Sequence, residues 1–220
     1  MATKDLMESQ ALRTTSPLFS DIAAILLAGG ASRRMGGENK AFIKINGKTI
    51  IQTEIEILEP LFERIIVVNN SFEQYAFLKK PMFADIKPGY GPLGGIFTGL
   101  NRCSRQYGFV LPCDMPFLNQ EVVSLICRRS PGHDLTIPRI LGHLEPLHAV
   151  YSTRCIPFIE KLMQRGELKI AKLFDEVDKL EIRQQELSAI DPSLRFRINV
   201  NTPTDLDKAI KMVRTNSPPF

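Results

Sequence analysis

The stretch that decides the fold is Ile25-Leu26-Leu27-Ala28-Gly29-Gly30-Ala31-Ser32-Arg33-Arg34-Met35-Gly36-Gly37-Glu38-Asn39-Lys40. The apolar run from Ile22 to Ala28 has the length and composition of a buried strand, and paired glycines end it abruptly. Glycines let a ligand approach the backbone N–H groups, and successive N–H groups form an anion-binding concavity. Because arginines and a lysine add positive charge, the stretch predicts a loop that holds a nucleoside triphosphate, rather than an ordinary glycine-rich turn.

Strand and helix patterns alternate over the first 130 residues. We expect strands at 22–28, 64–68, 82–84 and 107–111, and helices at 50–58, 72–80, 93–103 and 119–129. This order predicts a parallel sheet with helices on both faces. Ligands in such folds bind beyond the carboxyl ends of the strands, so the residues that follow the four strands should meet at one edge. These residues are Ala28, Asn69, Asp85 and Asp114.

Turn and capping residues add detail along the rest of the chain. Asn46-Gly47 predicts a hairpin over 42–49, and Thr49 is placed to cap the helix that follows. Farther on, strands are expected at 135–138, 145–151, 179–183 and 195–200, with helices at about 153–164 and 168–174. Thr202 and Pro203 predict the start of a last helix. Gly47-Lys48-Thr49 lacks the first glycine of a P-loop, so that interpretation is rejected.

Size and composition favour one α/β domain over 21–214. The chain has 220 residues, of which 44% are apolar, and no apolar run reaches the eighteen residues of a membrane span. Residues 1–20 lack the apolar centre of a signal peptide, and we expect a flexible N-terminal extension there. The four cysteines show neither zinc-ligand spacing nor a disulfide pattern, which fits a reducing, cytoplasmic location.

The charge balance favours a small anionic substrate. The net charge is +4 and the pI is about 8.9, but the basic pairs are scattered and tryptophan is absent. A nucleic-acid-binding surface would gather its basic residues in a stripe. We therefore expect no nucleic-acid partner and no membrane partner.

Several of these motifs together resemble the nucleotidyltransferases, and most closely the molybdenum cofactor guanylyltransferases. The resemblance begins with Leu27–Gly30, Arg34–Gly37 and Lys40, although the family has an aspartate where this chain has Asn39. It continues through the segments Gly91–Gly95, Pro112–Pro116, Glu145–Tyr151 and Asn199–Pro203. It implies a single-domain, three-layer Rossmann-like fold with a mostly parallel sheet.

The resemblance also implies roles for individual residues. The residues that would bind GTP are Leu27, Ala28, Gly29, Gly30, Lys40, Asn69, Asp85, Gly91, Gly95 and Asp114. Asp114 would also hold Mg²⁺, the implied cofactor, and the catalytic residues would be Lys40, Asp114 and Arg34. The pterin substrate would lie against Arg34, Gly37, Asn199 and Asn201. A GTP-binding half would span about 21–130 and a pterin-binding half about 131–214, while His148 is expected to be structural.

The reaction implied is nucleotidyl transfer. The terminal phosphate of molybdopterin would attack the α-phosphorus of GTP, and pyrophosphate would leave, so both molecules are expected partners. We expect a monomer that contacts cofactor-inserting proteins and molybdoenzymes transiently. Two alternatives stay open: a related enzyme that uses CTP or another phosphorylated acceptor, and a non-catalytic GTP-binding module. Asp85 is our hypothesis for base selection, because a carboxylate accepts both guanine donors.

Overall fold

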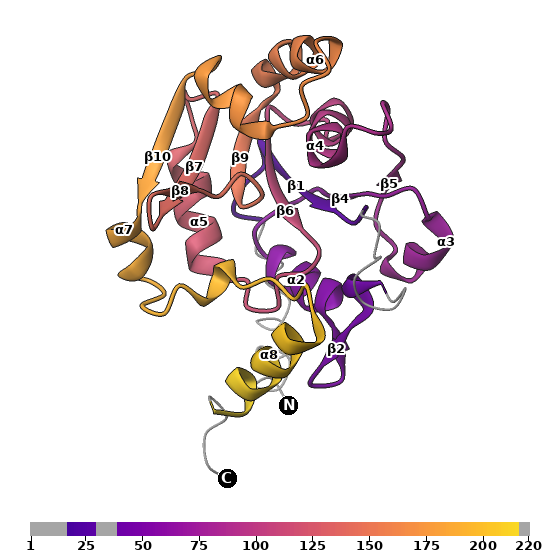
Figure 1. Ribbon diagram of the computed structural model, residues 1–220, viewed down its shortest axis with the longest axis vertical. Coiled ribbons are helices and arrows are strands. Elements are labelled where there is room, and N and C mark those ends of the chain that lie inside the picture. Colours follow the sequence, from indigo (N-terminus) through magenta and orange to yellow (C-terminus); the bar gives the residue numbers. More distant parts are fainter. Residues whose placement is uncertain (1–16, 30–38, 216–220) are drawn as a thin grey trace, which may run out of the picture.

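A central sheet of eight strands organises the computed structural model, which describes residues 17–29 and 39–215 (Figure 1). The strand order is β10-β7-β9-β6-β1-β4-β5, and β8 pairs with β7. The strands are β1 Ile22–Leu27, β4 Ile65–Val68, β5 Met82–Phe83, β6 Tyr107–Pro112, β7 Leu135–Ile140, β8 His143–Leu144, β9 Ala149–Ser152 and β10 Lys179–Arg183. A separate two-stranded hairpin consists of β2 Lys44–Ile45 and β3 Lys48–Thr49.

The predicted mostly parallel sheet is confirmed. Strand β1 lies between β4 and β6 and runs parallel to both, and β5 continues in the same direction beside β4. In the other half of the sheet, β9 runs antiparallel to both β6 and β7, while β10 runs parallel to β7. The four strands that precede the predicted site residues therefore all end at one edge.

Helices cover both faces of the sheet, so the three layers are also confirmed (Figure 1). Side chains of β1 alternate: Ala24 and Leu26 pack with α2 and α5, whereas Ile25 and Leu27 pack with α4 and α6. The α-helices are α2 Ile50–Leu58, α3 Phe72–Tyr75, α4 Gly91–Arg102, α5 Gln120–Arg129, α6 Ile156–Gln164, α7 Gln184–Ser188 and α8 Pro203–Thr215. Short 3₁₀ turns are η1 Lys40–Phe42, η2 Ala76–Leu78, η3 Thr153–Cys155, η4 Ile170–Asp175 and η5 Arg195–Arg197.

Two glycines let α4 and β6 approach the side chain of Ile25. A Cβ atom on Gly99 would lie 2.4 Å from Cγ2 of Ile25, and one on Gly108 would lie 2.3 Å from its Cδ1. No real side chain tolerates such distances, so both positions need glycine for this packing. The close approach fixes α4 against β1, with the first turn of the helix near the carboxyl end of the strand.

Local signals at the start of the chain are confirmed in detail. Asn46 and Gly47 have φ angles of 52° and 83°, as a two-residue type I′ hairpin turn requires. The Thr49 hydroxyl accepts the N–H of Gln52, whose side chain accepts the N–H of Thr49, so a capping box begins α2. The last helix begins at Pro203, as predicted.

Three predictions in the second half are wrong. Strand β7 continues to Ile140 and turns into β8, so the predicted 145–151 strand shrinks to β9. The 168–174 segment forms the 3₁₀ turn η4, and helix α7 was not predicted. The 195–200 segment is not a strand, because the Asp191 carboxylate accepts the Phe196 N–H at 2.9 Å and Val200 donates its N–H to a loop carbonyl.

Candidate functional site

The carboxyl edge of β1, β4, β5 and β6 gathers the predicted site residues that the structure describes. Ala28 follows β1, Asn69 follows β4, Asp85 follows β5 after one residue, and Asp114 follows β6 after one residue. Gly30, Arg34 and Gly37 lie outside the described residues. The described part of the candidate site therefore consists of the segments on either side of 30–38, the loops at the sheet edge and the segment before α8.

Lys40 connects the 3₁₀ turn η1 with the segment before α8. Its ammonium group donates a hydrogen bond of 2.6 Å to Oδ1 of Asn201. The backbone of Asn201 is itself held, because the Asp205 carboxylate accepts the N–H groups of Asn201 and Thr202 at 3.2 and 2.9 Å. Lys40 and Asn201, predicted for two different substrates, thus lie in direct contact.

Asp114 presents a carboxylate oxygen that the described residues leave unpaired. Its Oδ1 is shielded from solvent and has no hydrogen-bond partner among them. Burial raises the pKa of Asp114, and the positive charge of Lys40 opposes that shift. A shielded carboxylate oxygen without a partner is what a cation ligand provides, so Asp114 fits the magnesium role. Within the described part of the chain no three His, Cys, Asp or Glu side chains cluster for a metal. Substrate phosphates would have to supply further ligands.

Glu54 is a buried acidic residue beside the Asp114 loop that the sequence reasoning did not single out. It lies on α2, is 0% exposed, and accepts the Met115 N–H at 2.9 Å through Oε1. Burial raises its pKa well above the ordinary value, the Met115 hydrogen bond lowers it, and the charge of Asp114 raises it further. The available signal was its spacing: Glu54 falls on the face that Ile50, Ile51 and Leu58 turn to the core.

Asn69 and Asp85 occupy two different environments at the same edge. Asn69 is 0% exposed; its Oδ1 accepts the Ser71 N–H at 2.8 Å, and its buried Nδ2 has no partner among the described residues. Asp85 is paired with Asn70, which donates Nδ2 to the carboxylate at 2.9 Å and accepts the Asp85 N–H at 3.0 Å. The buried amide of Asn69 is therefore available to a ligand, while Asp85 is held in a fixed orientation.

Tyr75 links the two chain segments that flank residues 30–38. Its hydroxyl donates to the carbonyl of Ala28 at 2.9 Å and accepts from Nδ2 of Asn39 at 2.7 Å. Burial is the main cause that raises the pKa of Tyr75 to about 12, so the hydroxyl keeps its proton as a donor. The other end of the Asn39 amide accepts the Ala41 N–H at 3.1 Å. Asn39, at a position where the resemblance implies an aspartate, thus connects Tyr75 to the turn that carries Lys40.

The second glycine-rich loop divides into one turn residue and one packing residue. Gly91 begins α4 with a φ of 54°, a conformation that favours glycine. A Cβ atom on Gly95 would lie 3.0 Å from Cδ2 of Leu27, so Gly95 allows α4 to pack on β1. This contact gives Gly95 and Leu27 a packing role besides the ligand contact predicted for them; Gly29, by contrast, is exposed.

A cavity of about 180 Å³ opens beside the Asp114 loop. Its lining comes from that loop, from the turn before β9 and from the segment after η5: Pro112, Met115, Glu145, Pro146, Leu147, His148, Arg197 and Asn199. His148 is 2% exposed and lies between the rings of Phe109 and Phe196, with centroid distances of 5.3 and 4.9 Å. Burial lowers the pKa of His148 to about 3, and neither ring nitrogen has a partner among the described residues.

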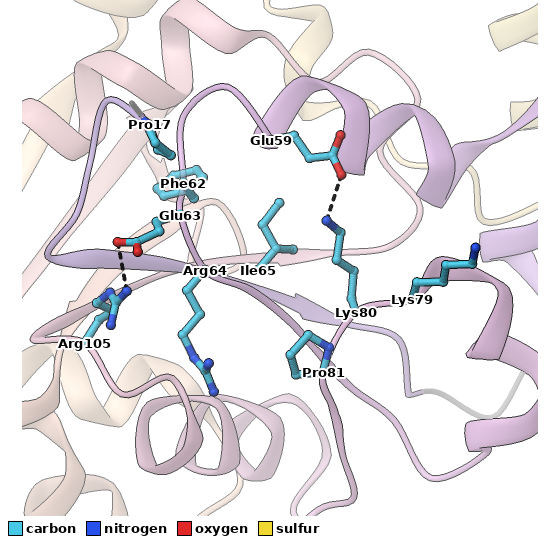
Figure 2. A pocket seen from close by; sticks show the side chains of 10 residues that line it. All are labelled: Pro17, Glu59, Phe62, Glu63, Arg64, Ile65, Lys79, Lys80, Pro81 and Arg105. Carbon is cyan, nitrogen blue, oxygen red and sulfur yellow. Dashed lines mark hydrogen bonds and ion pairs between the residues drawn. The ribbon is translucent and has the colours of Figure 1, made fainter. Parts of the chain in front are cut away.

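A larger cavity, of about 550 Å³, lies at the opposite edge of the sheet, where β4 and β5 begin. Figure 2 shows two of its basic side chains in ion pairs: Lys80 pairs with Glu59 at 2.7 Å and Arg105 with Glu63 at 3.0 Å. Arg64 donates to the carbonyl of Arg102 at the end of α4. These contacts stabilise the structure, and we assign no chemistry to this cavity.

Comparisons with known proteins identify the family of the chain. The pattern of the family described as "MobA-like NTP transferase domain" matches residues 24–181. The chain is similar to the molybdenum cofactor guanylyltransferase of Desulfosudis oleivorans, with 34% identity over 86% of this chain and 94% of that protein. It is also similar to a probable molybdenum cofactor guanylyltransferase of Methanosarcina mazei, with 38% identity over 86% of this chain and 89% of that protein.

A solved structure extends the similarity to three dimensions. It is the molybdopterin-guanine dinucleotide biosynthesis protein A of Archaeoglobus fulgidus, which superposes with a TM-score of 0.76. The match has 26% identity and covers 88% of this chain and 99% of that one.

Among the described residues, no helix has both the length and the apolar character needed to cross a membrane.

Proposed function

This chain belongs to the family of MobA-like NTP transferase domains, and from that membership we propose that it is a molybdenum cofactor guanylyltransferase. It transfers GMP from GTP to the terminal phosphate of the molybdopterin cofactor. The observation that carries this conclusion is the 34–38% identity to proteins of that name over 86% of the chain. Two features of the site support this reaction: the contact between Lys40 and Asn201, and the unpaired oxygen of Asp114.

The reaction exchanges one phosphoanhydride bond for another. An oxygen of the acceptor phosphate forms a bond to the α-phosphorus of GTP, and the bond from that phosphorus to the bridging oxygen breaks. Pyrophosphate leaves with the bonding electrons. Because no covalent enzyme intermediate is needed, the protein acts by positioning the reactants and by offsetting negative charge.

The negative charge at the transferred phosphate is offset by Lys40, by Arg34 and by the metal that Asp114 would hold. Lys40 places an ammonium group beside the Asp114 loop, and Arg34 adds a second cation from the segment outside the described residues. Asp114 would hold Mg²⁺, and the unpaired Oδ1 supports that assignment. The metal would supply further positive charge to the triphosphate.

The two substrates occupy neighbouring subsites. The GTP subsite consists of Leu27, Ala28, Gly29, Gly30, Lys40, Asn69, Asp85, Gly91, Gly95 and Asp114, and the free amide of Asn69 supports it. The pterin subsite consists of Arg34, Gly37, Asn199 and Asn201, and the cavity lined by Asn199 supports it. In this division, about 21–130 binds GTP and about 131–214 binds the pterin.

The cellular setting completes the proposal. A cytoplasmic location is supported by four cysteines that are all unpaired. There the enzyme acts as a monomer and meets cofactor-inserting proteins and molybdoenzymes transiently, to hand over its product.

One incubation tests the function against its alternatives. The protein is mixed with Mg²⁺, molybdopterin cofactor and each nucleoside triphosphate in turn, and both pyrophosphate and the attached nucleotide are measured. Release with GTP and attachment of GMP are expected. Attachment of CMP instead would indicate a related cytidylyltransferase, and GTP binding without pyrophosphate would indicate a non-catalytic module.

A further inference from the structure

A single peptide unit, the one between Asp114 and Met115, is held from both sides. Its carbonyl, which belongs to Asp114, accepts the N–H of Val200 at 2.9 Å. Its N–H, which belongs to Met115, donates to Oε1 of Glu54 at 2.9 Å. Because a peptide unit is planar, these two bonds together fix its rotation. The Cα atom of Asp114 lies in the plane of this unit, so the point from which the Asp114 side chain leaves the backbone is held with it.

The two partners come from elements far apart in sequence. Val200 lies between Asn199 and Asn201 in the segment before α8, whereas Glu54 lies in the middle of α2. Val200 provides a backbone group, which any residue except proline would supply. Glu54 provides a side chain, so the identity of this residue decides whether the Met115 N–H has an acceptor.

A carboxyl group is an unusual choice for this position. Glu54 is 0% exposed on a helix face of isoleucines and leucine, and its Oε2 has no partner among the described residues. An apolar side chain would fill the same space without burying a carboxyl group, but it would leave the Met115 N–H without an acceptor. Glu54 is therefore explained by the peptide unit that it holds and not by packing alone.

We propose that Glu54 is a positioning residue for nucleotidyl transfer, which orients the Asp114 carboxylate by accepting the Met115 N–H. Without this acceptor, the peptide unit can rotate about the remaining Val200 bond, and Asp114 no longer presents its unpaired oxygen to the metal and triphosphate. The inference rests on the proposed role of Asp114. It predicts a defect in turnover and in magnesium use, not in GTP binding as such.

Three variants of the full-length protein test the proposal. Glu54→Gln keeps an oxygen acceptor at the same place, Glu54→Leu removes it at similar volume, and Glu56→Leu makes the same change at an exposed position of α2. With GTP and molybdopterin, we expect kcat of Glu54→Leu to fall by about 10²-fold, as for a catalytic group displaced by about 1 Å. Its half-saturating Mg²⁺ concentration should rise while KM for GTP stays near the wild-type value. Glu54→Gln should restore kcat to about one third of wild type or more.

A second measurement does not depend on activity. Hydrogen exchange of the peptide that spans residues 112–118 should be at least about tenfold faster in Glu54→Leu than in wild type, Glu54→Gln or Glu56→Leu. If Glu54→Leu does not fold, Glu54→Asp replaces it, because the shorter side chain withdraws the acceptor by one methylene. Unchanged exchange in a folded variant, or a normal kcat and magnesium requirement, overturns the proposal. An inactive wild-type protein overturns the proposed function instead and leaves the exchange result to decide on Glu54.

Discussion

The ammonium group of Lys40 and the side-chain oxygen of Asn201 are 2.6 Å apart although 161 positions separate them in the sequence. This bond connects the turn after the glycine-rich loop with the segment before the last helix. Lys40, which we propose offsets the charge of GTP, is thereby in direct contact with Asn201, which we propose contacts the pterin. The acceptor phosphate and the α-phosphorus must come into contact for the proposed transfer, so we expect the two substrates to meet beside this bond.

Replacing Lys40 with alanine should reduce turnover far more than stability. The loss of one preorganised donor to developing phosphate charge costs about 2.7–4 kcal/mol in the transition state. Steady-state pyrophosphate release measures this, and a thermal melt checks the fold. Lys44→Ala, on the hairpin strand that follows, is the matched control. Activity of Lys40→Ala within threefold of wild type would reduce Lys40 to a surface lysine.

Asp114→Asn should abolish most magnesium-dependent activity and leave the fold intact. The amide has nearly the shape of the carboxylate, and the loop is held through the backbone of residues 114 and 115, which the substitution does not alter. We expect a loss of about 10²–10³-fold in the rate at saturating GTP. A magnesium titration of the rate is the measurement, and an unchanged titration curve would contradict the metal assignment.

Asn39→Asp should weaken the link through Tyr75, even though the family has aspartate at this position. The Tyr75 hydroxyl has one hydrogen, which it donates to Ala28 while it accepts from Asn39. A carboxylate at position 39 can only accept, so it would compete with Ala28 for that hydrogen. We expect a loss of roughly 1 kcal/mol in the free energy of unfolding.

Tyr75→Phe provides the comparison for this prediction. If the two positions act through one hydrogen-bond chain, Asn39→Asp should destabilise Tyr75→Phe much less than it destabilises wild type. Urea denaturation of the four proteins gives the coupling. Additive effects would mean that Asn39 and Tyr75 act separately.

Asp85→Ala should narrow the preference for GTP over CTP. A carboxylate accepts the two donors of guanine and repels the acceptors of cytosine, and Asn70 holds the Asp85 carboxylate in place. Loss of this group should reduce the ratio of kcat/KM values for the two nucleotides at least roughly tenfold. Glu73→Ala, an exposed acidic residue of α3, is the control. An unchanged ratio would move base selection to the backbone around Leu27 or to Asn69.

His148 should make the protein sensitive to acid. Burial lowers the pKa of His148 to about 3 from its ordinary value of 6.5, so between these values the unfolded chain binds a proton that the folded chain does not. The stability that depends on neutral His148 is fully present above pH 6.5 and falls as the pH drops toward 3. Replacing His148 with leucine removes this dependence.

Denaturation of wild type and His148→Leu at several pH values measures the effect. Their difference in unfolding free energy should move in favour of the variant by roughly 2–3 kcal/mol between pH 7 and pH 4.5. Taking the difference cancels the opposite contribution of Glu54, whose pKa burial raises. His143→Leu, at an exposed position of β8, is the matched control for the replacement of a histidine. Parallel pH curves for wild type and His148→Leu would contradict the prediction.

The first half of the fold could be predicted because each signal there acts locally. Thr49 and Gln52 are three positions apart, and the Asn46-Gly47 turn satisfies its own backbone requirements. Apolar runs also identify β1, β4 and β6 directly. The convergence of Asn69, Asp85 and Asp114 then followed from one general rule about parallel sheets.

The features that were missed depend on partners distant in sequence. The β7–β8 hairpin turns through Leu141 with a φ of 49°, which no turn signature assigns to leucine. Residues 195–200 alternate like a strand, but Asp191 and the Asp114 carbonyl take up their N–H groups. Glu54 belongs to the same class, because only the folded chain brings the Met115 N–H to it.

The position of β9 has a consequence for synthesis on the ribosome. This strand lies between β6 and β7 and bonds to both, although both precede it in the chain. As the chain emerges from its amino end, the edge of β6 therefore stays open until Ala149–Ser152 has left the exit tunnel. During that interval the unpaired edge of β6 is exposed to neighbouring nascent chains, whose strands can pair with it wrongly. The half of the chain that we propose binds GTP is thus translated early but completed late.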